Sequence, residues 1–118
     1  MDKNQLREDS VNFAIAVSDV CDGVKGCSVF VNQLVRASSS IGANIHEARY
    51  AQSRADFISK LEIALKESSE TDYWLELLFR KGKLTEVQNK TLRNQCGAIR
   101  RRLISSITTA KGKEQEKR

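Results

Sequence analysis

The sequence predicts an all-α protein, an up-down-up-down antiparallel four-helix bundle, and three observations support this fold class. The chain of 118 residues contains no proline, 6% aromatic residues and 30% charged residues, a composition that favours long helices over sheets. In four segments, apolar residues recur at steps of three and four, which places them on one face of a helix. Because the connections between these segments are short, consecutive helices must fold back on one another.

The first helix is predicted at residues 4–22. Its apolar stripe consists of Leu6, Phe13, Val17 and either Val20 or Cys21. Gly23 suits the left-handed conformation that commonly follows a helix end. Ser28 is a favourable N-cap for the next helix, since its hydroxyl can accept a hydrogen bond from a first-turn amide.

The second and third helices are predicted at residues 29–52 and 54–81, and they form the centre of the fold. Ser53 followed by Asp56 is a capping-box signal that separates them. The second helix contains the small residues of ASSSIGAN at 37–44, which allow a neighbouring helix to approach closely. Asn44 near this patch suggests a polar network that fixes the register of the helices, with a ligand site as the alternative.

The fourth helix is predicted to begin at a second capping box, Thr85 with Gln88, and to reach about Thr109. Gly82 is expected to end the third helix. Residues 1–110 therefore form the four-helix bundle. Residues 111–118 lack an apolar anchor and are expected to be a disordered basic tail.

The charge of the chain is distributed unevenly along the sequence. Residues 1–79 carry 8 Lys/Arg and 12 Asp/Glu, whereas residues 80–118 carry 12 Lys/Arg and 3 Asp/Glu. One interpretation is that the acidic third helix and the basic fourth helix attract each other, within one chain or between subunits. The other is a polyanion-binding surface. The candidate nucleic-acid-binding residues are Lys90, Arg93, Arg100, Arg101 and Arg102.

No aromatic side chains alternate with these cations, so the pattern indicates contact with a phosphate backbone rather than recognition of bases. Arg93 and Arg100 are seven residues apart and share a face of the helix. Arg100, Arg101 and Arg102 are consecutive and point in different directions.

The residues required for catalysis are not found in a recognisable pattern, and we expect no enzymatic activity, no metal and no cofactor. A di-iron site in a helix bundle needs two Glu-x-x-His motifs, but Ala43 stands three residues before His46, the single histidine. The three cysteines form no CxxC pair and are expected to be free thiols. No apolar run approaches the ~20 residues that span a bilayer, and we expect a cytoplasmic protein without membrane contact.

Two helices carry more apolar residues than one bundle core requires, which predicts a homo-oligomer. The residues beyond the main stripes are Phe30, Val35, Tyr50, Ile58, Ile63, Leu65 and Leu77.

The segments QLVRASSSIGANIHEA at residues 33–48 and SRADFISKLEIALKESSETDYWL at residues 53–75 resemble a known family. They are similar to the four-helix-bundle proteins encoded by intervening sequences in bacterial large-subunit ribosomal RNA genes. The accessory variability proteins of diversity-generating retroelements are related to these. Positions that match the family signature, with structural or interface roles, are Arg36, Ser40, Asn44, Glu47, Glu67, Glu70, Tyr73 and Trp74.

The resemblance implies a homopentameric ring. In the retroelement branch it also implies binding to nucleic acid and to a reverse transcriptase. Together with the charge pattern, it leads to a hypothesis of a non-enzymatic homo-oligomer that binds RNA or DNA non-specifically through the fourth helix. The alternative is a protein-interaction scaffold, such as an accessory subunit of a reverse transcriptase, without nucleic-acid binding of its own.

Overall fold

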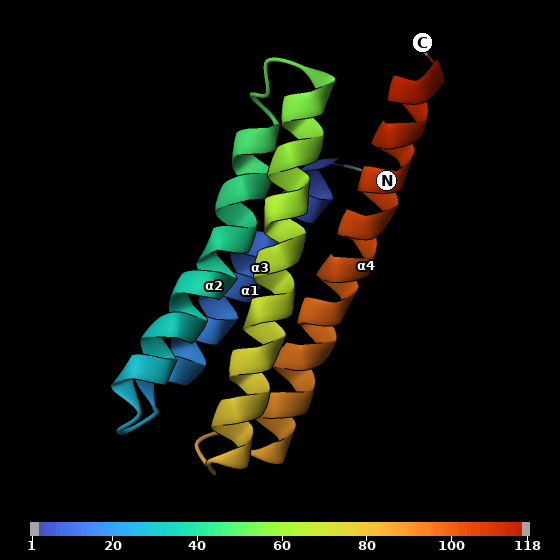
Figure 1. Ribbon diagram of the computed structural model, residues 1–118. Coiled ribbons are helices and arrows are strands. Elements are labelled where there is room, and N and C mark those ends of the chain that lie inside the picture. The colour runs from blue at the N-terminus through green and yellow to red at the C-terminus, as the bar shows by residue number, and fades with distance from the viewer. Residues whose placement is uncertain (1–2, 117–118) are drawn as a thin grey trace.

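The computed structural model describes residues 3–116 and confirms the predicted all-α bundle (Figure 1). The four helices are α1 (Lys3–Asp22), α2 (Ser28–Ala48), α3 (Arg54–Arg80) and α4 (Glu86–Glu116). Each helix packs against two neighbours: α1 contacts α2 and α4, and α3 contacts the same two helices. The chain therefore runs up, down, up and down around one core, with dimensions of 52 × 21 × 20 Å.

The predicted apolar stripes form this core. Its largest fully buried apolar side chains come from all four helices, and they are Phe13, Val17, Leu34, Ile41, Leu75, Leu78 and Leu103. Because these side chains recur at helical spacing, they lie on one face of each helix, and the burial of these faces stabilises the bundle.

The connection between α1 and α2 differs from the prediction. The amides of Gly23 and Val24 still bond to the carbonyls three residues before them, at 3.1 and 3.0 Å, so the helical turn continues past Gly23. The left-handed conformation falls instead on Gly26 (φ 79°) and Cys27 (φ 55°). Cys27 precedes the helix and its side chain makes no capping hydrogen bond, so the prediction of Ser28 as N-cap was wrong.

Between α2 and α3, one capping prediction is confirmed, and α2 is shorter than predicted. α2 ends at Ala48 rather than at residue 52, because the amides of Arg49, Tyr50 and Ala51 bond to carbonyls three residues earlier and tighten the chain into a turn. The Ser53 hydroxyl then accepts a hydrogen bond from the Asp56 amide at 3.0 Å, as predicted for the start of α3.

The connection between α3 and α4 agrees with both predictions, the helix end at Gly82 and the capping box of Thr85 and Gln88. Gly82 is left-handed (φ 74°), and the amides of Gly82 and Lys83 bond to the carbonyls of Phe79 and Leu78, which is a Schellman end. Thr85 and Gln88 cap α4 reciprocally, at 2.9 and 3.0 Å.

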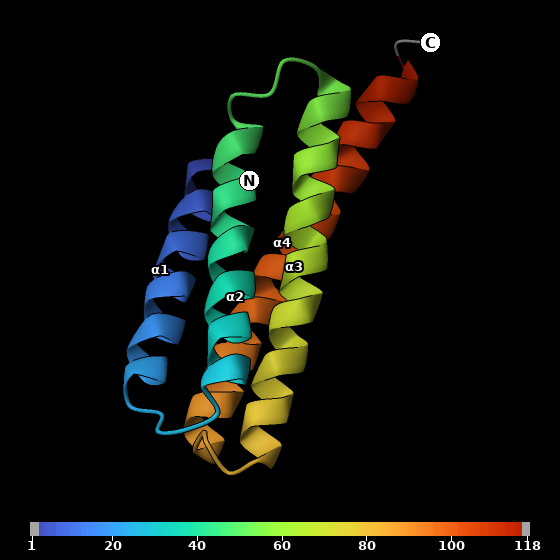
Figure 2. The same ribbon diagram turned by 60° about the vertical axis from the view of Figure 1, so that its left-hand side comes forward.

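α4 extends beyond its predicted end at about Thr109 and reaches Glu116 (Figures 1 and 2). Residues 111–116, expected to be part of a disordered tail, are helical, while residues 117–118 lie outside the described part of the chain. Ala110 is buried, and the Lys111 ammonium lies 3.0 Å from the Glu62 carboxylate of α3, so contacts with the bundle continue past the predicted end.

The small residues of α2 permit a close approach of α1. A Cβ added at Gly42 would lie 3.1 Å from the Ser10 hydroxyl oxygen, closer than ordinary van der Waals contact. The Ser10 hydroxyl donates to the Arg7 carbonyl at 2.7 Å, which satisfies this buried group within its own helix. Asn44 donates to the Ser40 carbonyl at 2.8 Å, also within one helix. The polar contacts across helices are therefore made elsewhere.

Candidate nucleic-acid interface

The cations of α4 are the starting point for a candidate site. Between residues 87 and 113 the chain has no Asp or Glu, and its basic residues are Lys90, Arg93, Arg100, Arg101, Arg102, Lys111 and Lys113. At 3.6 residues per turn these side chains leave the helix in three directions: towards α3, towards α1 and towards solvent. Their partners on the neighbouring helices decide what each cation can bind.

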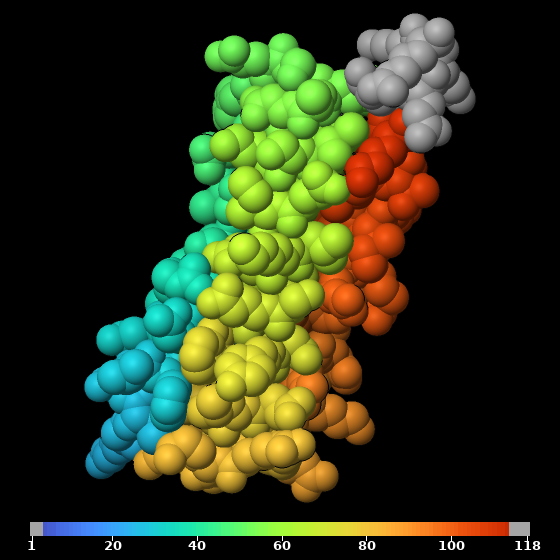
Figure 3. All heavy atoms as spheres, in the orientation of Figure 1, coloured from blue at the N-terminus to red at the C-terminus, as the bar shows by residue number. Residues whose placement is uncertain are grey.

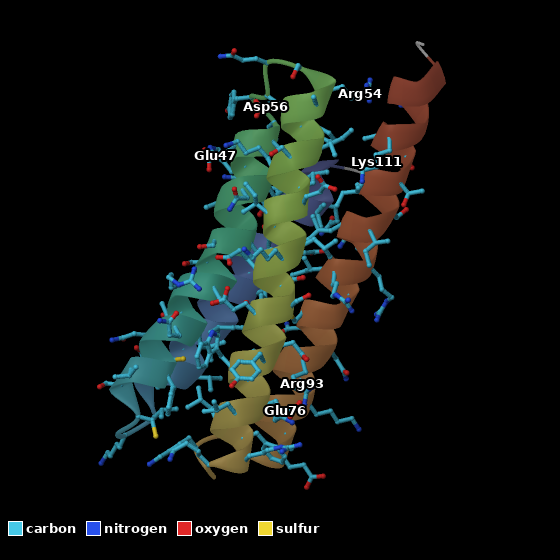
Figure 4. The ribbon with its side chains drawn as sticks, viewed as in Figure 1. Glu47, Arg54, Asp56, Glu76, Arg93 and Lys111 are labelled. Carbon is cyan, nitrogen blue, oxygen red and sulfur yellow. The ribbon has the colours of Figure 1, made fainter. Side chains whose placement is uncertain are left out.

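Towards α3, Arg93 is engaged within the fold. Its guanidinium donates two hydrogen bonds to the Asp72 carboxylate, at 2.9 and 3.1 Å, and lies 3.5 Å from Glu76 (Figure 4). The hydrogen bonds to Asp72 raise the pKa of Arg93 above its ordinary value. Bidentate arginine–carboxylate pairs are among the stronger polar contacts in proteins. Arg93 therefore joins α3 and α4 and is not an open phosphate ligand.

Towards α1, Arg102 is also engaged. It pairs with Asp9, whose carboxylate accepts a second hydrogen bond from the Gln5 side chain at 2.9 Å. The hydrogen bonds from Arg102 and then Gln5 lower the pKa of Asp9 below its usual value. This pair connects the first and last helices of the bundle.

The Asp9–Arg102 pair predicts a pH dependence of stability. An Asp whose folded-state pKa is lowered stabilises the fold above its unfolded pKa of ~3.9, and this contribution is lost as the pH falls below that value. The substitution Asp9→Asn should lower Tm by a few degrees at pH 7. The difference from wild type, measured by circular dichroism, should become smaller as the pH falls below ~3.9. Asp19→Asn, at an exposed position of α1, is the matched control, and an equal effect of both substitutions would contradict the assignment.

Lys90, Arg100 and Arg101 are exposed, and within the described residues no carboxylate lies within ion-pair distance of them. Lys90 and Arg101 are eleven residues apart and face the same direction. Arg100 lines a shallow recess between α3 and α4 together with Ser68, Ser69, Asp72, Cys96 and Gly97. Of the five predicted nucleic-acid-binding residues, three are thus directed to solvent and two are held in intramolecular ion pairs.

A second group of cations lies at the end of the bundle where α3 connects to α4. The connections after α1 and α3 lie side by side at this end (Figures 1 and 3), and the Lys83 ammonium donates to the Lys25 carbonyl at 2.9 Å. Lys25, Arg80 and Lys81 are exposed. This group was not predicted from the sequence, although the run RKGK at residues 80–83 contains three of its four cations. Only the fold brings Lys25 to the same end.

Four of the signature residues, Arg36, Glu67, Glu70 and Trp74, form a polar cluster between α2 and α3. The Arg36 guanidinium donates to Glu67 at 2.9 Å and also pairs with Glu70, which accepts from the Trp74 indole at 3.4 Å. Burial raises the pKa of Glu70, but the hydrogen bonds from Trp74 and Arg36 outweigh it, and the pKa lies below its usual value. Glu67 is 8% exposed, so Arg36 neutralises a largely buried carboxylate.

Outside the ion pairs of this cluster, the signature residues make weaker contacts. The Trp74 ring stacks on Phe30 at 5.9 Å between centroids and meets Tyr73 edge-on at 5.0 Å. Glu47 lies 3.9 Å from Lys60, a distant and solvent-exposed pair. The cluster therefore links the two central helices.

The described residues do not offer an assembled catalytic group. Among residues 4–113, whose side chains are described, no group of three His, Cys, Asp or Glu could hold a metal ion. All three cysteines are free, and burial raises the pKa of Cys96 to about 12, which keeps the thiol protonated. Within the same part of the chain, no helix is long and apolar enough to cross a membrane.

α1 and α2 lie side by side (Figure 2), and an open apolar groove runs along their outer face. It has a volume of about 400 Å³, and its lining residues are Ser10, Val11, Ala14, Ile15, Ser18, Ser39, Gly42, Ala43 and His46. Ile15 is 53% exposed there. Val35 is also exposed and lies on the same side of α2, seven residues before Gly42.

The apolar residues beyond the main stripes, from which an oligomer was predicted, lie in different environments in the structure. Ile58 belongs to the core, and Phe30 and Leu65 pack against it. Leu77 is half-buried, whereas Val35, Tyr50 and Ile63 are exposed. The exposed apolar surface of α1, at Val11 and Ile15, was not predicted, because these residues lie outside the main stripe of that helix.

Comparison with known proteins places the chain among relatives. The family described as 23S rRNA-intervening sequence protein matches residues 2–105. A crystal structure of a protein of unknown function from the S23 ribosomal protein family of Bacteroides thetaiotaomicron is 43% identical, with a TM-score of 0.86. That comparison covers 92% of this chain and 99% of the other. No curated protein matches the chain.

Proposed function

The chain belongs to the family of 23S rRNA-intervening sequence proteins, and on that premise we propose that it is a non-enzymatic homo-oligomer that binds RNA or DNA without sequence preference. The observation that carries the proposal is the uncompensated positive charge of Lys90, Arg100 and Arg101, on a stretch of α4 that contains no carboxylate. Exposed cations of this kind bind phosphates and release counterions. Lys25, Lys81 and Lys83 add positive charge at one end of the bundle, where Arg80 pairs with Glu76.

Three cations on one subunit bind nucleic acid weakly, so the proposal includes self-association. The groove between α1 and α2 supports it, because exposed Val11, Ile15 and Val35 would be covered by a second copy of the chain. Neither Lys90, Arg100 nor Arg101 lines this groove. A ring or other closed oligomer could therefore present the cations of several subunits to one strand.

The substitutions Arg100→Gln and Arg101→Gln, made together, should weaken binding of a labelled 20-nucleotide single-stranded RNA at least tenfold at 50 mM salt. Each phosphate contact contributes ~0.7 to the slope of log K against log salt concentration for single strands, so the slope should fall by about 1.4 per engaged subunit. Fluorescence anisotropy at several salt concentrations measures both quantities. DNA of the same length should behave similarly, because the surface contacts phosphates rather than bases.

Lys60→Gln with Lys66→Gln removes the same charge from α3 and is the matched control. If both double variants lower the affinity for RNA equally, net charge explains the binding, and the assignment of the binding site to α4 is wrong. If wild type does not bind RNA at low salt, the proposed activity is wrong.

A second function is favoured by the ion pairs of Arg93 and Arg102, which show that α4 uses part of its charge to hold α3 and α1. In this view the protein is an interaction scaffold, for example an accessory subunit of a reverse transcriptase. It would form the same oligomer, would not take up RNA at any salt concentration, and would bind an acidic protein through the exposed cations. Light scattering coupled to size exclusion, with and without RNA, distinguishes the two functions.

A further inference from the structure

Two arginines lie on the side of α4 that faces α3, and their surroundings differ. Arg93 and Arg100 are seven residues apart, which places them ~10 Å apart along one face of the helix. Arg93 is held by the carboxylate of Asp72, whereas Arg100 borders the recess between the two helices. Asp72 lines this recess as well, so one carboxylate lies beside both arginines.

The pair of Asp72 and Arg93 lies at the surface of the bundle. The side chain of Asp72 is 42% exposed and that of Arg93 is 32% exposed, so a nucleic acid can approach the guanidinium from outside. Glu76, one turn after Asp72 on α3, lies 3.5 Å from the same guanidinium and 3.1 Å from that of Arg80 (Figure 4). Two carboxylates of α3 therefore neutralise two arginines along this side of the molecule.

A carboxylate and a phosphate bind a guanidinium in the same way. Each presents two oxygens to the parallel N–H groups of an arginine and forms a bidentate pair. The carboxylate of Asp72 accepts hydrogen bonds from Nε and from one Nη of Arg93, the same groups that a phosphate would use. Because Asp72 belongs to the same chain, a phosphate can bind Arg93 in this manner only by displacing it.

We propose that Asp72 is an internal competitor of nucleic acid, which occupies Arg93 and restricts phosphate binding to the solvent-facing side of α4. This inference rests on the proposed nucleic-acid binding and adds the residue that limits it. The carboxylate withdraws Arg93 from the available cations, and its charge repels a phosphate that approaches Arg100 across the recess. The strand therefore follows Lys90 and Arg101, which lie ~16 Å apart along the helix.

A purely structural role of the pair predicts a different result. Ion pairs between partly exposed side chains contribute little to the stability of a protein. If the pair only joined α3 to α4, removal of the carboxylate would loosen this contact and would not strengthen the binding of RNA. An increase in affinity on loss of Asp72 therefore distinguishes a competitor from a structural contact.

The substitution Asp72→Asn tests the proposal, because it keeps the shape of the side chain and removes its charge. Fluorescence anisotropy with the labelled 20-nucleotide RNA should show an affinity at least fivefold higher than that of wild type at 50 mM salt. Since Arg93 becomes a further phosphate contact, the slope of log K against log salt concentration should steepen by ~0.7 per engaged subunit. Circular dichroism should show that the variant remains folded.

The inference and the proposed function fail in different ways. If wild type binds RNA and Asp72→Asn changes neither the affinity nor the slope, the inference is wrong and the proposed function stands. If neither protein binds RNA at low salt, both are wrong. Binding by Asp72→Asn alone would support the competition in its strongest form.

Two further variants identify the source of the increase. Arg93→Gln combined with Asp72→Asn should return the affinity and the slope to about the wild-type values, because the pair is neutral in wild type and absent in this variant. Glu47→Gln removes one negative charge from α2, which does not contact α4 within the described helices, and should leave the affinity unchanged (Figure 4). Equal increases from Glu47→Gln and Asp72→Asn, or an increase that persists without Arg93, would overturn the proposal.

Discussion

The substitution Ile15→Lys is expected to convert the proposed oligomer into monomers and to weaken the proposed RNA binding by at least ~100-fold. Ile15 is 53% exposed in the groove between α1 and α2, where a second copy would cover it. A lysine at this position would have to lose its hydration in an apolar interface, which costs several kcal/mol. Because linking several weak sites raises affinity ~10²–10⁴-fold, loss of the oligomer removes that gain although no cation of α4 is changed.

Size exclusion with light scattering measures the mass, and anisotropy with the same RNA measures the affinity. Ile63→Lys is the matched control, since Ile63 is 42% exposed on α3 and outside the groove. If Ile63→Lys dissociates the oligomer and Ile15→Lys does not, the subunit interface lies on the face that contains Ile63 and not in the groove. If the wild-type protein is monomeric, the groove is not a subunit interface, and linked sites do not explain the affinity for RNA.

Two residues before Ile15 the same helix faces the core, and the substitution Phe13→Ala should cause the largest loss of stability in the chain. Phe13 is 1% exposed and contributes to the core from α1. Removing a buried Phe side chain costs ~3–5 kcal/mol, because apolar contacts are lost and a cavity remains. Against a typical total of ~5–15 kcal/mol, this loss leaves the domain marginally stable and should lower Tm by more than ~10 °C.

Urea unfolding at fixed protein concentration measures this effect, since the stability of an oligomer depends on concentration. Asn12→Ala, at an exposed position of the same helix, should change the free energy of unfolding by no more than ~0.5 kcal/mol. A loss below ~1 kcal/mol for Phe13→Ala would mean that α1 packs differently.

The fold could be predicted from the sequence because its determinants are local. The spacing of Leu34, Ile41 and Leu75 shows which side of each helix is buried, and the capping boxes at Ser53 and Thr85 mark two helix starts. The errors are local as well. Gly23 and Gly26 are both suited to a left-handed conformation, and the spacing alone does not show that it falls on Gly26 and Cys27.

The candidate site was less predictable, because helical spacing gives the direction of a side chain but not its partner on another helix. Arg93 and Arg100 share a face of α4, yet Arg93 lies opposite Asp72 and forms a bidentate pair, while Arg100 borders an open recess. Lys25 and Lys83 are far apart in sequence and meet at one end of the bundle. The register between helices, which sets these pairs, depends on contacts such as that of Gly42 with Ser10.

The order of helix contacts also bears on synthesis of the chain. α2 packs on α1 and on α3, and α3 packs on α4, so each of these contacts joins segments that are consecutive in sequence. A helical hairpin can therefore form as soon as its second helix leaves the ribosome, at ~5–20 residues per second. The contact of α1 with α4 is different, because it joins the first helix to the last. α1 consequently remains without one of its two neighbours until α4 has been synthesised, and Asp9 cannot pair with Arg102 before then.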